Sequence, residues 1–177
     1  MIKTVRKKLE EILDKEIVTH DNRLSNEKIN AFENKFQIKI PEEYRWFLVN
    51  YSESYINSDY QFPMIEKSMI TPKSGFETID FLYSSDFIEN AEQYISNYGK
   101  EMIPIGEASG DTVCIGVQGD GFGKIYYVYH EDEDENLNYY LIAESFDKFI
   151  LSFEKRVENM INLDEVEIEL DDDLWND

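Results

Sequence analysis

Thiol and imidazole side chains are nearly missing from this chain. Its 177 residues include one cysteine, Cys114, and two histidines, His20 and His130. A single cysteine cannot form a disulfide within the chain, and it rules out a zinc site built from several thiolates. Cys114 lies between Val113 and Ile115, which favours a buried, unreactive thiol over a nucleophile.

Long apolar runs are missing as well. No stretch approaches the roughly 18 apolar residues that a membrane-spanning helix requires. Residues 1–16 interrupt every apolar stretch with charged side chains, so they lack the apolar centre of a secretory signal peptide. We therefore expect a cytoplasmic protein that has no membrane partner.

Basic side chains are scarce relative to acidic ones. The chain has 17 Lys and Arg against 38 Asp and Glu, which gives a formal net charge of -21. The imbalance is greatest in residues 131–177, which carry 17 acidic and 3 basic side chains. Such a surface repels nucleic acid and anionic lipid and attracts cationic proteins. The charge predicts a basic protein partner and no direct binding to nucleic acid; an acidic surface that serves only solubility is the alternative.

Apolar periodicity predicts five helices. Apolar residues recur at spacings of three and four in residues 2–16, after Ser25, after Pro41, before Gly99 and after Ser145. Ser25 and Ser145 are predicted N-caps, because a serine oxygen can accept a hydrogen bond from the first helical turn. Pro41 is predicted to be the first residue of its helix, where no backbone N–H is needed.

Strand-forming residues dominate much of the second half of the chain. We predict strands at residues 78–83, 102–105, 112–117, 124–130 and 139–143. Most of these segments follow one another through short turns, which favours antiparallel pairing. The predicted fold class is α+β, with a central, largely antiparallel sheet and helices packed around it.

Glycines at Gly119, Gly121 and Gly123 superficially resemble a phosphate-binding loop. The residue after Lys124 is Ile125, where such a loop needs Ser or Thr, and a strand follows instead of a helix. The spacing also differs from that of a dinucleotide-binding loop. A hairpin turn is therefore the preferred interpretation, and no nucleotide cofactor is predicted.

Asp132, Asp134 and Asn136 imitate the beginning of a calcium-binding EF-hand loop. The sixth position of that loop requires glycine, and the chain has Leu137 there. The twelfth position requires a bidentate glutamate, and the chain has Ala143. We therefore predict no metal site and no cofactor.

Catalytic patterns are weak in this sequence. No G-x-S-x-G nucleophile motif is present, and pairs of carboxylates are too abundant to indicate acid–base chemistry. We expect that the protein is not an enzyme. An alternative that stays open is an enzyme that uses Asp111, His130 and Glu131, which would lose its function in a His130→Ala variant.

The motifs together resemble a known superfamily. Residues 24–48 contain a helix of the type I-x-x-F-E, then a φ-x-φ-P link, then x-x-Y-x-x-F-L. Later segments continue the pattern at Ile105 and Gly106, Gly110 and Asp111, His130 and Glu131, and Ser145 through Phe149. This order resembles the SUKH superfamily, which includes fungal regulators of cell-wall synthesis and bacterial immunity proteins. Tyr129 departs from the pattern, since Asp is common there.

The resemblance implies a SUKH-like domain at residues 24–155. Residues 1–23 would precede it as an amphipathic helix and loop, and residues 156–177 would follow as an acidic extension. It also implies function as a bacterial immunity protein, an antitoxin that binds a cognate toxin domain and occludes its site. A non-catalytic regulatory scaffold for cellular proteins, as in the fungal relatives, is the alternative.

An acidic surface suits the inhibition of a nuclease, because a nuclease must be cationic where it holds phosphate. Carboxylates can occupy those phosphate positions and bind the same Arg and Lys side chains. The predicted partner-binding residues are acidic, with one histidine beside them: Asp111, Asp120, His130, Glu131, Asp132, Glu133, Asp134 and Glu135.

Overall fold

The computed structural model describes residues 2–14, 23–51, 54–69, 71–108, 110–130 and 139–156. The helices in this part of the chain are α1 (Ile2–Ile12), α2 (Asn26–Phe36), α3 (Glu42–Asn50), α4 (Phe87–Tyr98) and α5 (Phe146–Ser152), with a short 3-10 helix η1 (Gly119–Gly121). The strands are β1 (Ser54–Tyr55), β2 (Tyr60–Pro63), β3 (Phe76–Glu77), β4 (Phe81–Leu82), β5 (Met102–Ala108), β6 (Asp111–Gly116), β7 (Ile125–Val128), β8 (Tyr139–Ala143) and β9 (Glu154–Lys155).

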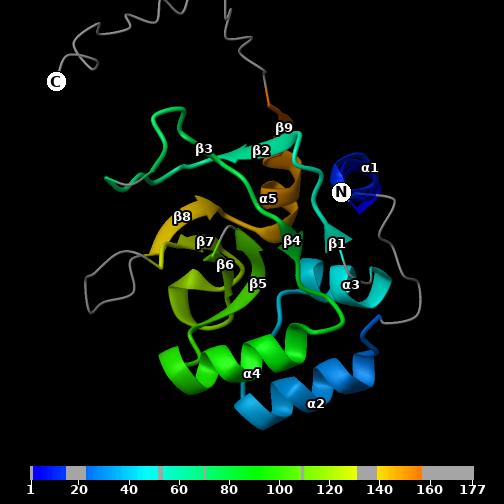
Figure 1. The fold of residues 1–177 in the computed structure, drawn as a ribbon. Helices are drawn as coiled ribbons and strands as arrows, with labels where there is room; N and C mark the ends of the chain where they lie inside the picture. The colour runs from blue at the N-terminus through cyan, green and yellow to red at the C-terminus, as the bar shows by residue number, and fades with distance from the viewer. Residues whose placement is uncertain are drawn as a thin grey trace, which may run out of the picture.

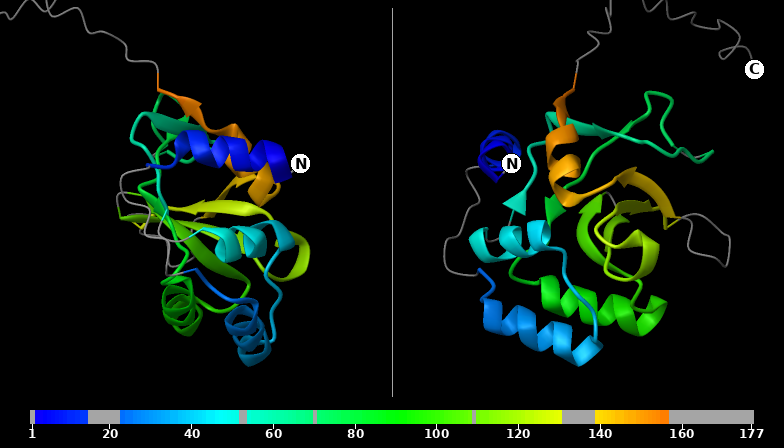
Figure 2. Two further views of the ribbon diagram at one scale, coloured as in Figure 1. Left: turned by 90° about the vertical axis from the view of Figure 1, so that its right-hand side faces the viewer. Right: turned by 180° about the vertical axis from the view of Figure 1, so that it is seen from behind.

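The strands form two antiparallel sheets. The larger sheet has six strands in the order β1-β4-β5-β6-β7-β8, and the smaller has three in the order β3-β2-β9. In Figure 1, α4 and α2 lie on one side of the larger sheet, while α5, α1 and the smaller sheet lie on the other. The turned views in Figure 2 show the same layers. The predicted α+β class with an antiparallel central sheet is confirmed.

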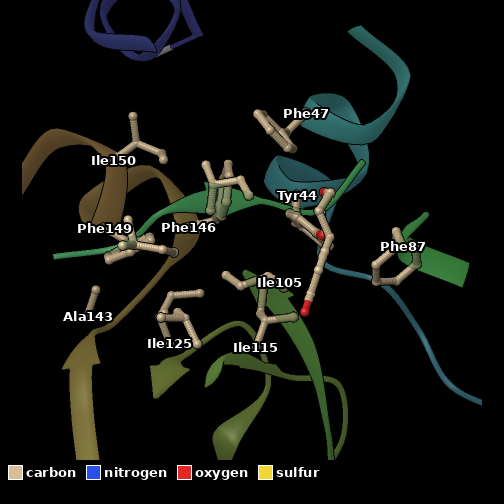
Figure 3. Packing of buried hydrophobic residues seen from close by; sticks show 14 of the residues in the cluster. Tyr44, Phe47, Phe87, Ile105, Ile115, Ile125, Ala143, Phe146, Phe149 and Ile150 are labelled. Carbon is tan, nitrogen blue, oxygen red and sulfur yellow. The ribbon is translucent and has the colours of Figure 1, made fainter. Parts of the chain in front are cut away.

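Aromatic side chains from three helices fill the centre of the core, as Figure 3 shows. Tyr44 of α3 packs against Phe87 of α4 and Phe146 of α5, with ring centroids 5.5 and 5.2 Å apart. All three residues are buried, and the Tyr44 hydroxyl donates a hydrogen bond to the Tyr83 carbonyl at 3.1 Å. The buried phenol is thereby satisfied, as a polar group in an apolar core must be. Burial raises the pKa of Tyr44 well above its ordinary value.

Helix α1 contributes to this same core. Val5, Leu9 and Ile12 are buried along one face, and α1 packs against α5. Their spacing of four and three residues is that of a single helical stripe, as the sequence predicts. Ile2, at the outer end of the stripe, is exposed.

Local capping agrees with two of the sequence predictions and differs from a third. Ser25 accepts a hydrogen bond from the Lys28 backbone N–H at 3.4 Å, and Ser145 accepts one from Lys148 at 3.3 Å. Both are the predicted N-caps. Pro41 is the N-cap of α3, and its first helical residue is one position later.

The predicted strand at residues 78–83 is wrong in extent. The chain instead forms β3 before this segment and β4 at its end, and the two strands belong to different sheets. The chain crosses between the sheets at Thr78–Asp80, so continuous pairing is impossible there. Asp80 still links both neighbours of β4, because its N–H bonds to Glu107 and its carbonyl accepts from Ile56.

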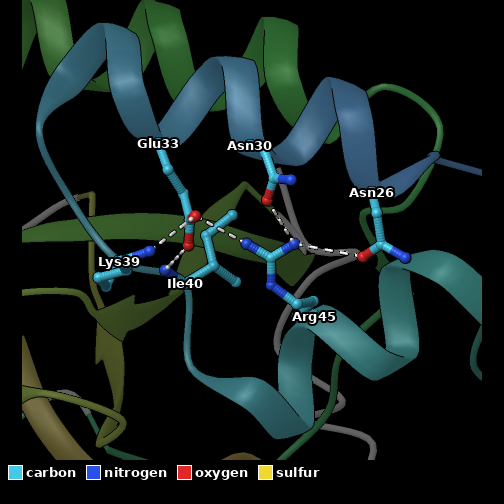
Figure 4. Close-up of polar contacts among 6 residues, drawn as sticks. All are labelled: Asn26, Asn30, Glu33, Lys39, Ile40 and Arg45. Atoms are coloured by element: carbon cyan, nitrogen blue, oxygen red, sulfur yellow. Dashed lines mark hydrogen bonds and ion pairs between the residues drawn. The ribbon is translucent and has the colours of Figure 1, made fainter.

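A buried carboxylate holds α2, α3 and the link between them together (Figure 4). The Glu33 side chain is 5% exposed and accepts the Ile40 backbone N–H at 2.8 Å. Its other oxygen is 2.7 Å from Nη2 of Arg45, and the exposed ammonium of Lys39 lies at 3.4 Å. Burial alone would raise the pKa of Glu33, but these hydrogen bonds and cations leave it below its ordinary value.

Arg45 is fixed from both sides by this arrangement. Its Nη1 donates to the side-chain oxygens of Asn26 and Asn30, at 3.3 and 3.2 Å. The guanidinium therefore joins α3 to the side of α2 that carries Asn26, Asn30 and Glu33. The I-x-x-F-E signature thus has a structural role, since its final glutamate orients the link that leads to Pro41.

Candidate partner-binding surface

Asp111 and His130, both predicted from sequence, meet at one end of the β6–β7 hairpin. The Asp111 Oδ1 atom accepts the His130 backbone N–H at 2.9 Å and lies 2.7 Å from Nδ1 of the imidazole. Its Oδ2 accepts the Tyr127 hydroxyl at 3.0 Å. The carboxylate is largely enclosed and the imidazole is more than half exposed. Asp111 therefore fixes the chain where β7 ends, and the exposed His130 is presented beside it.

A second carboxylate extends this cluster. The Tyr129 hydroxyl lies 3.1 Å from Oε1 of Glu77 and 3.2 Å from Oγ1 of Thr71. Burial, and then the nearby Asp111 charge, raise the pKa of Glu77. Burial is also the main cause that raises the pKa of Tyr129 to about 12. Tyr129 thus replaces the Asp of the superfamily pattern with a phenol that ties the large sheet to the segment around β3.

Residues 131–138 follow His130 directly and lie outside the described residues. They include the predicted contact residues Glu131, Asp132, Glu133, Asp134 and Glu135, which therefore stay predictions. The two flanking residues are defined: His130 is held by Asp111, and Tyr139 begins β8 in register with Val128.

Asp120 lies away from the other predicted residues. It belongs to η1, in the turn that joins β6 to β7, whereas Asp111 begins β6. Strand β6 separates them, and six residues at about 3.3 Å each span roughly 20 Å. The structure therefore brings Asp111 and His130 together and places Asp120 at the opposite end of the hairpin.

The turn around Asp120 has a closely packed backbone. A Cβ atom added at Gly116 would overlap the carbonyl of Gly121, so only glycine permits this approach. The Gly123 N–H bonds to the Gly116 carbonyl, and the Gly116 N–H bonds to the Lys124 carbonyl, both at 2.9 Å. Gly123 also has φ 81, in the region that disfavours side chains. The glycine pattern is thus a hairpin turn, as the sequence predicts.

Two hollows lie on either side of this turn, and Gln118 lines both. The first has a volume of about 500 Å³ and includes Tyr126 and Tyr139 in its lining. The second, of about 610 Å³, lies beside α2 and includes Ile38 and Phe122. The turn is therefore a ridge between two depressions, and the Gln118 amide donates to the Gln37 carbonyl at the end of α2, at 3.4 Å.

Aromatic side chains are exposed around the ridge. Phe122 and Tyr139 are each 49% exposed, and the Tyr139 ring stacks edge-on against Tyr126 at 5.4 Å. Burial raises the pKa of Tyr126, and the neighbouring Glu66 and Glu144 charges raise it further. Sequence reasoning missed these three residues, because it treated the strands as core and the turn as a connector. The available signal was a phenylalanine between two turn glycines, since a turn rarely buries its central side chain.

Cys114 and potential metal ligands are the remaining chemistry-bearing groups in the described part of the chain. Cys114 is fully buried, and burial raises the pKa of its thiol to about 12, so the thiolate nucleophile is not populated at neutral pH. No cluster of His, Cys, Asp or Glu in the described ranges is arranged to hold a metal ion. None of the described helices has both the length and the apolar character needed to cross a bilayer.

The fold is an α+β domain with two antiparallel sheets, and aromatic side chains of the kind enriched at interfaces are exposed beside its β6–β7 turn. The chain belongs to the SMI1 / KNR4 family (SUKH-1), whose family model matches residues 23–152. The resemblance noted in the sequence is thereby confirmed, and the family is generally non-catalytic.

A relative from Bacillus subtilis (strain 168) is similar over most of its length. It is the SPbeta prophage-derived uncharacterized protein YokK, which is 27% identical over 171 residues. The match covers 85% of this chain and 86% of the relative. It therefore extends beyond the segment that the family model covers.

Proposed function

We propose that this protein is a bacterial immunity protein that binds a cognate toxin domain and occludes its active site. The toxin is a basic nuclease, and the protein presents carboxylates where the nuclease would hold phosphate. Family membership supports the binding role, and the prophage origin of the relative supports a bacterial setting.

The observation that carries the proposal is where the acidic segment joins the fold. Residues 131–135 are five consecutive acidic residues, and they follow directly on the His130 that Asp111 anchors. Glu77 lies in the same cluster and adds a further carboxylate. Carboxylates that are concentrated next to the anchored His130 can form charge-assisted hydrogen bonds with Arg and Lys side chains of the toxin. Such hydrogen bonds are short and strong.

The electrostatic mechanism predicts fast association that depends steeply on salt. Opposite charges on the two partners steer their encounter, and this attraction is screened over about 8 Å at physiological ionic strength. Raising the salt concentration should therefore slow association more than it speeds dissociation. Stopped-flow or surface-based kinetics at several salt concentrations measure both rates.

The decisive experiment is a titration against the toxin domain that is encoded beside this gene. Stoichiometric loss of nuclease activity at low salt is the expected result, and full activity at an excess of the protein would refute the proposal. Replacing residues 132–134 with lysine should abolish inhibition. Replacing residues 171–173 with lysine reverses the same number of charges in the tail and serves as the matched control.

The same purified protein can be used to distinguish the two alternative functions, a scaffold and an enzyme. A scaffold for cellular proteins would recover several host proteins in a pull-down and would leave the nuclease active. An enzyme that depends on His130 would lose its function in a His130→Ala variant that keeps its fold. We expect that variant to inhibit the toxin better than the variant with lysine at 132–134.

A further inference from the structure

We propose that the turn at residues 118–124 is a preformed recognition element, which inserts the Phe122 ring into an apolar pocket of the partner while Asp120 pairs with a Lys or Arg at the pocket rim. This inference rests on the proposed function and specifies a contact surface for it. The surface lies at the opposite end of the β6–β7 hairpin from the Asp111–His130 pair.

The backbone of the turn is fixed before any partner arrives. Gly116 and Gly121 pack too closely to admit a side chain, and backbone hydrogen bonds join Gly116 to both Gly123 and Lys124. The Phe122 N–H bonds to the Gly119 carbonyl at 3.2 Å, inside the turn itself. A residue presented in this way loses little conformational entropy on binding, so more of its contact energy contributes to affinity.

Phe122 has the exposure expected of an interface anchor. The residue is 49% exposed although its side chain is fully apolar, and it lies on the ridge between the two hollows. Tyr139, which lines the first hollow, has the same exposed fraction. Large aromatic residues that become buried at the centre of an interface supply most of its affinity. The hollows of about 500 and 610 Å³ on either side are large enough to receive partner side chains.

The charges around the first hollow select a cationic partner. Two carboxylates and one ammonium line it, from Glu101, Asp120 and Lys124. Glu66 and Glu144 are near enough to Tyr126 to raise the pKa of its hydroxyl, after burial as the larger cause. The negative groups outnumber the positive one, and Asp120 is the exposed carboxylate that belongs to the turn itself. The complement of this surface is an apolar pocket with basic residues at its rim.

The test measures the affinity of single variants for the purified toxin domain encoded beside this gene, by calorimetry at low and high salt. Phe122→Ala should weaken binding about 30-fold or more at both salt concentrations, because its contact is apolar. Asp120→Lys should weaken it about tenfold at low salt and less at high salt. Phe122→Trp should retain most of the affinity.

Matched controls come from α5 and α1, whose residues line neither hollow. Leu151→Ala removes an apolar side chain of similar exposure from α5, and Glu10→Lys reverses a charge on α1. Both should change the affinity by about twofold or less. Thermal unfolding of each variant verifies that the fold is intact, which is expected because Phe122 and Asp120 are exposed.

The outcomes separate this inference from the proposed function. If the wild-type protein binds the toxin domain and Phe122→Ala binds within about twofold of it, the turn is not the recognition element and the immunity function stands. If the wild-type protein does not bind the toxin domain, the proposed function fails, and the inference that rests on it fails as well. A loss for Phe122→Ala that Phe122→Trp restores supports the turn as an aromatic anchor.

Discussion

Removing the Glu33 carboxylate should be among the most destabilising single changes that keep the apolar core intact. A Glu33→Ala variant leaves the Arg45 guanidinium, which is 14% exposed, without its ion-pair partner. It also leaves the Ile40 backbone N–H, a buried donor, without an acceptor. Breaking a buried pair costs about 3–5 kcal/mol, and an unsatisfied buried donor costs about 1–3 kcal/mol.

The two costs overlap, and Arg45 keeps its bonds to Asn26 and Asn30, so we expect a total of about 3 kcal/mol. The ammonium of Lys39 adds almost nothing, because that side chain is 77% exposed. Glu33→Gln keeps an oxygen for the Ile40 N–H, but its amide NH2 then faces Nη2 of Arg45, which is also a donor, so we expect about 2 kcal/mol. In a chain of this size each kcal/mol lowers Tm by about 2–4 °C.

Urea unfolding followed by circular dichroism measures these free energies. Glu92→Gln, which removes one partner of the exposed Lys35–Glu92 pair, is the matched control and should cost at most about 0.5 kcal/mol. The reasoning would be refuted if Glu33→Ala were destabilised by less than about 1 kcal/mol, or no more than the control.

The lowered pKa of Glu33 adds a dependence on pH. Its folded-state pKa is below the unfolded value, so the stabilisation is fully present above the unfolded pKa, near 4.5, and is lost as the pH falls through the folded pKa. Wild-type protein should therefore lose more stability on acidification than Glu33→Gln does. Parallel acid dependences of the two proteins would contradict this assignment.

Three further predictions concern other parts of the fold. Glu66 pairs with the β8 edge through the Leu141 backbone N–H at 2.7 Å, so Glu66→Ala should cost about 1 kcal/mol and speed hydrogen exchange at the Leu141 amide. Cys114, buried and with its thiol pKa raised to about 12, should react with a thiol reagent only at the rate of unfolding; fast labelling of the native protein would contradict its burial. Gly116→Ala should destabilise by about 2 kcal/mol or more in thermal or urea unfolding, since its Cβ would overlap the Gly121 carbonyl. Gly119→Ala meets no atom within 4 Å and is strained only by its left-handed backbone, with φ 58, so it should cost less, about 1 kcal/mol.

Local sequence was sufficient wherever the determining contacts are close along the chain. Ser25 and Ser145 cap their helices through residues three positions later, and β8 has the predicted bounds. The predicted strand at residues 78–83 failed because its pairing changes from one sheet to the other, a decision made by residues far away in sequence. The start of a helix depends on residues close by in sequence, whereas the pairing partner of a strand depends on the tertiary structure.

The candidate surface, too, could be predicted only in part. The sequence singled out Asp111 and His130 as candidate contact residues, and the antiparallel pairing of β6 with β7 brings them into contact. It could not show that Phe122 and Tyr139 remain exposed, because exposure depends on which elements cover each face of the sheet. Aromatic residues in strands and turns look alike in sequence whether they are core or contact residues.

The glycine-held turn has a consequence for how such a domain can change its partner over evolutionary time. Its conformation depends on Gly116 and Gly121 and on main-chain hydrogen bonds, and the Gln118 amide ties it to the end of α2, whereas the exposed side chains of Asp120 and Phe122 are not needed to form it. Substitutions at Asp120 and Phe122 can therefore alter the shape and charge of the ridge while the hairpin stays the same. Selection for a new partner could act on these two side chains without first having to restore the stability of the fold.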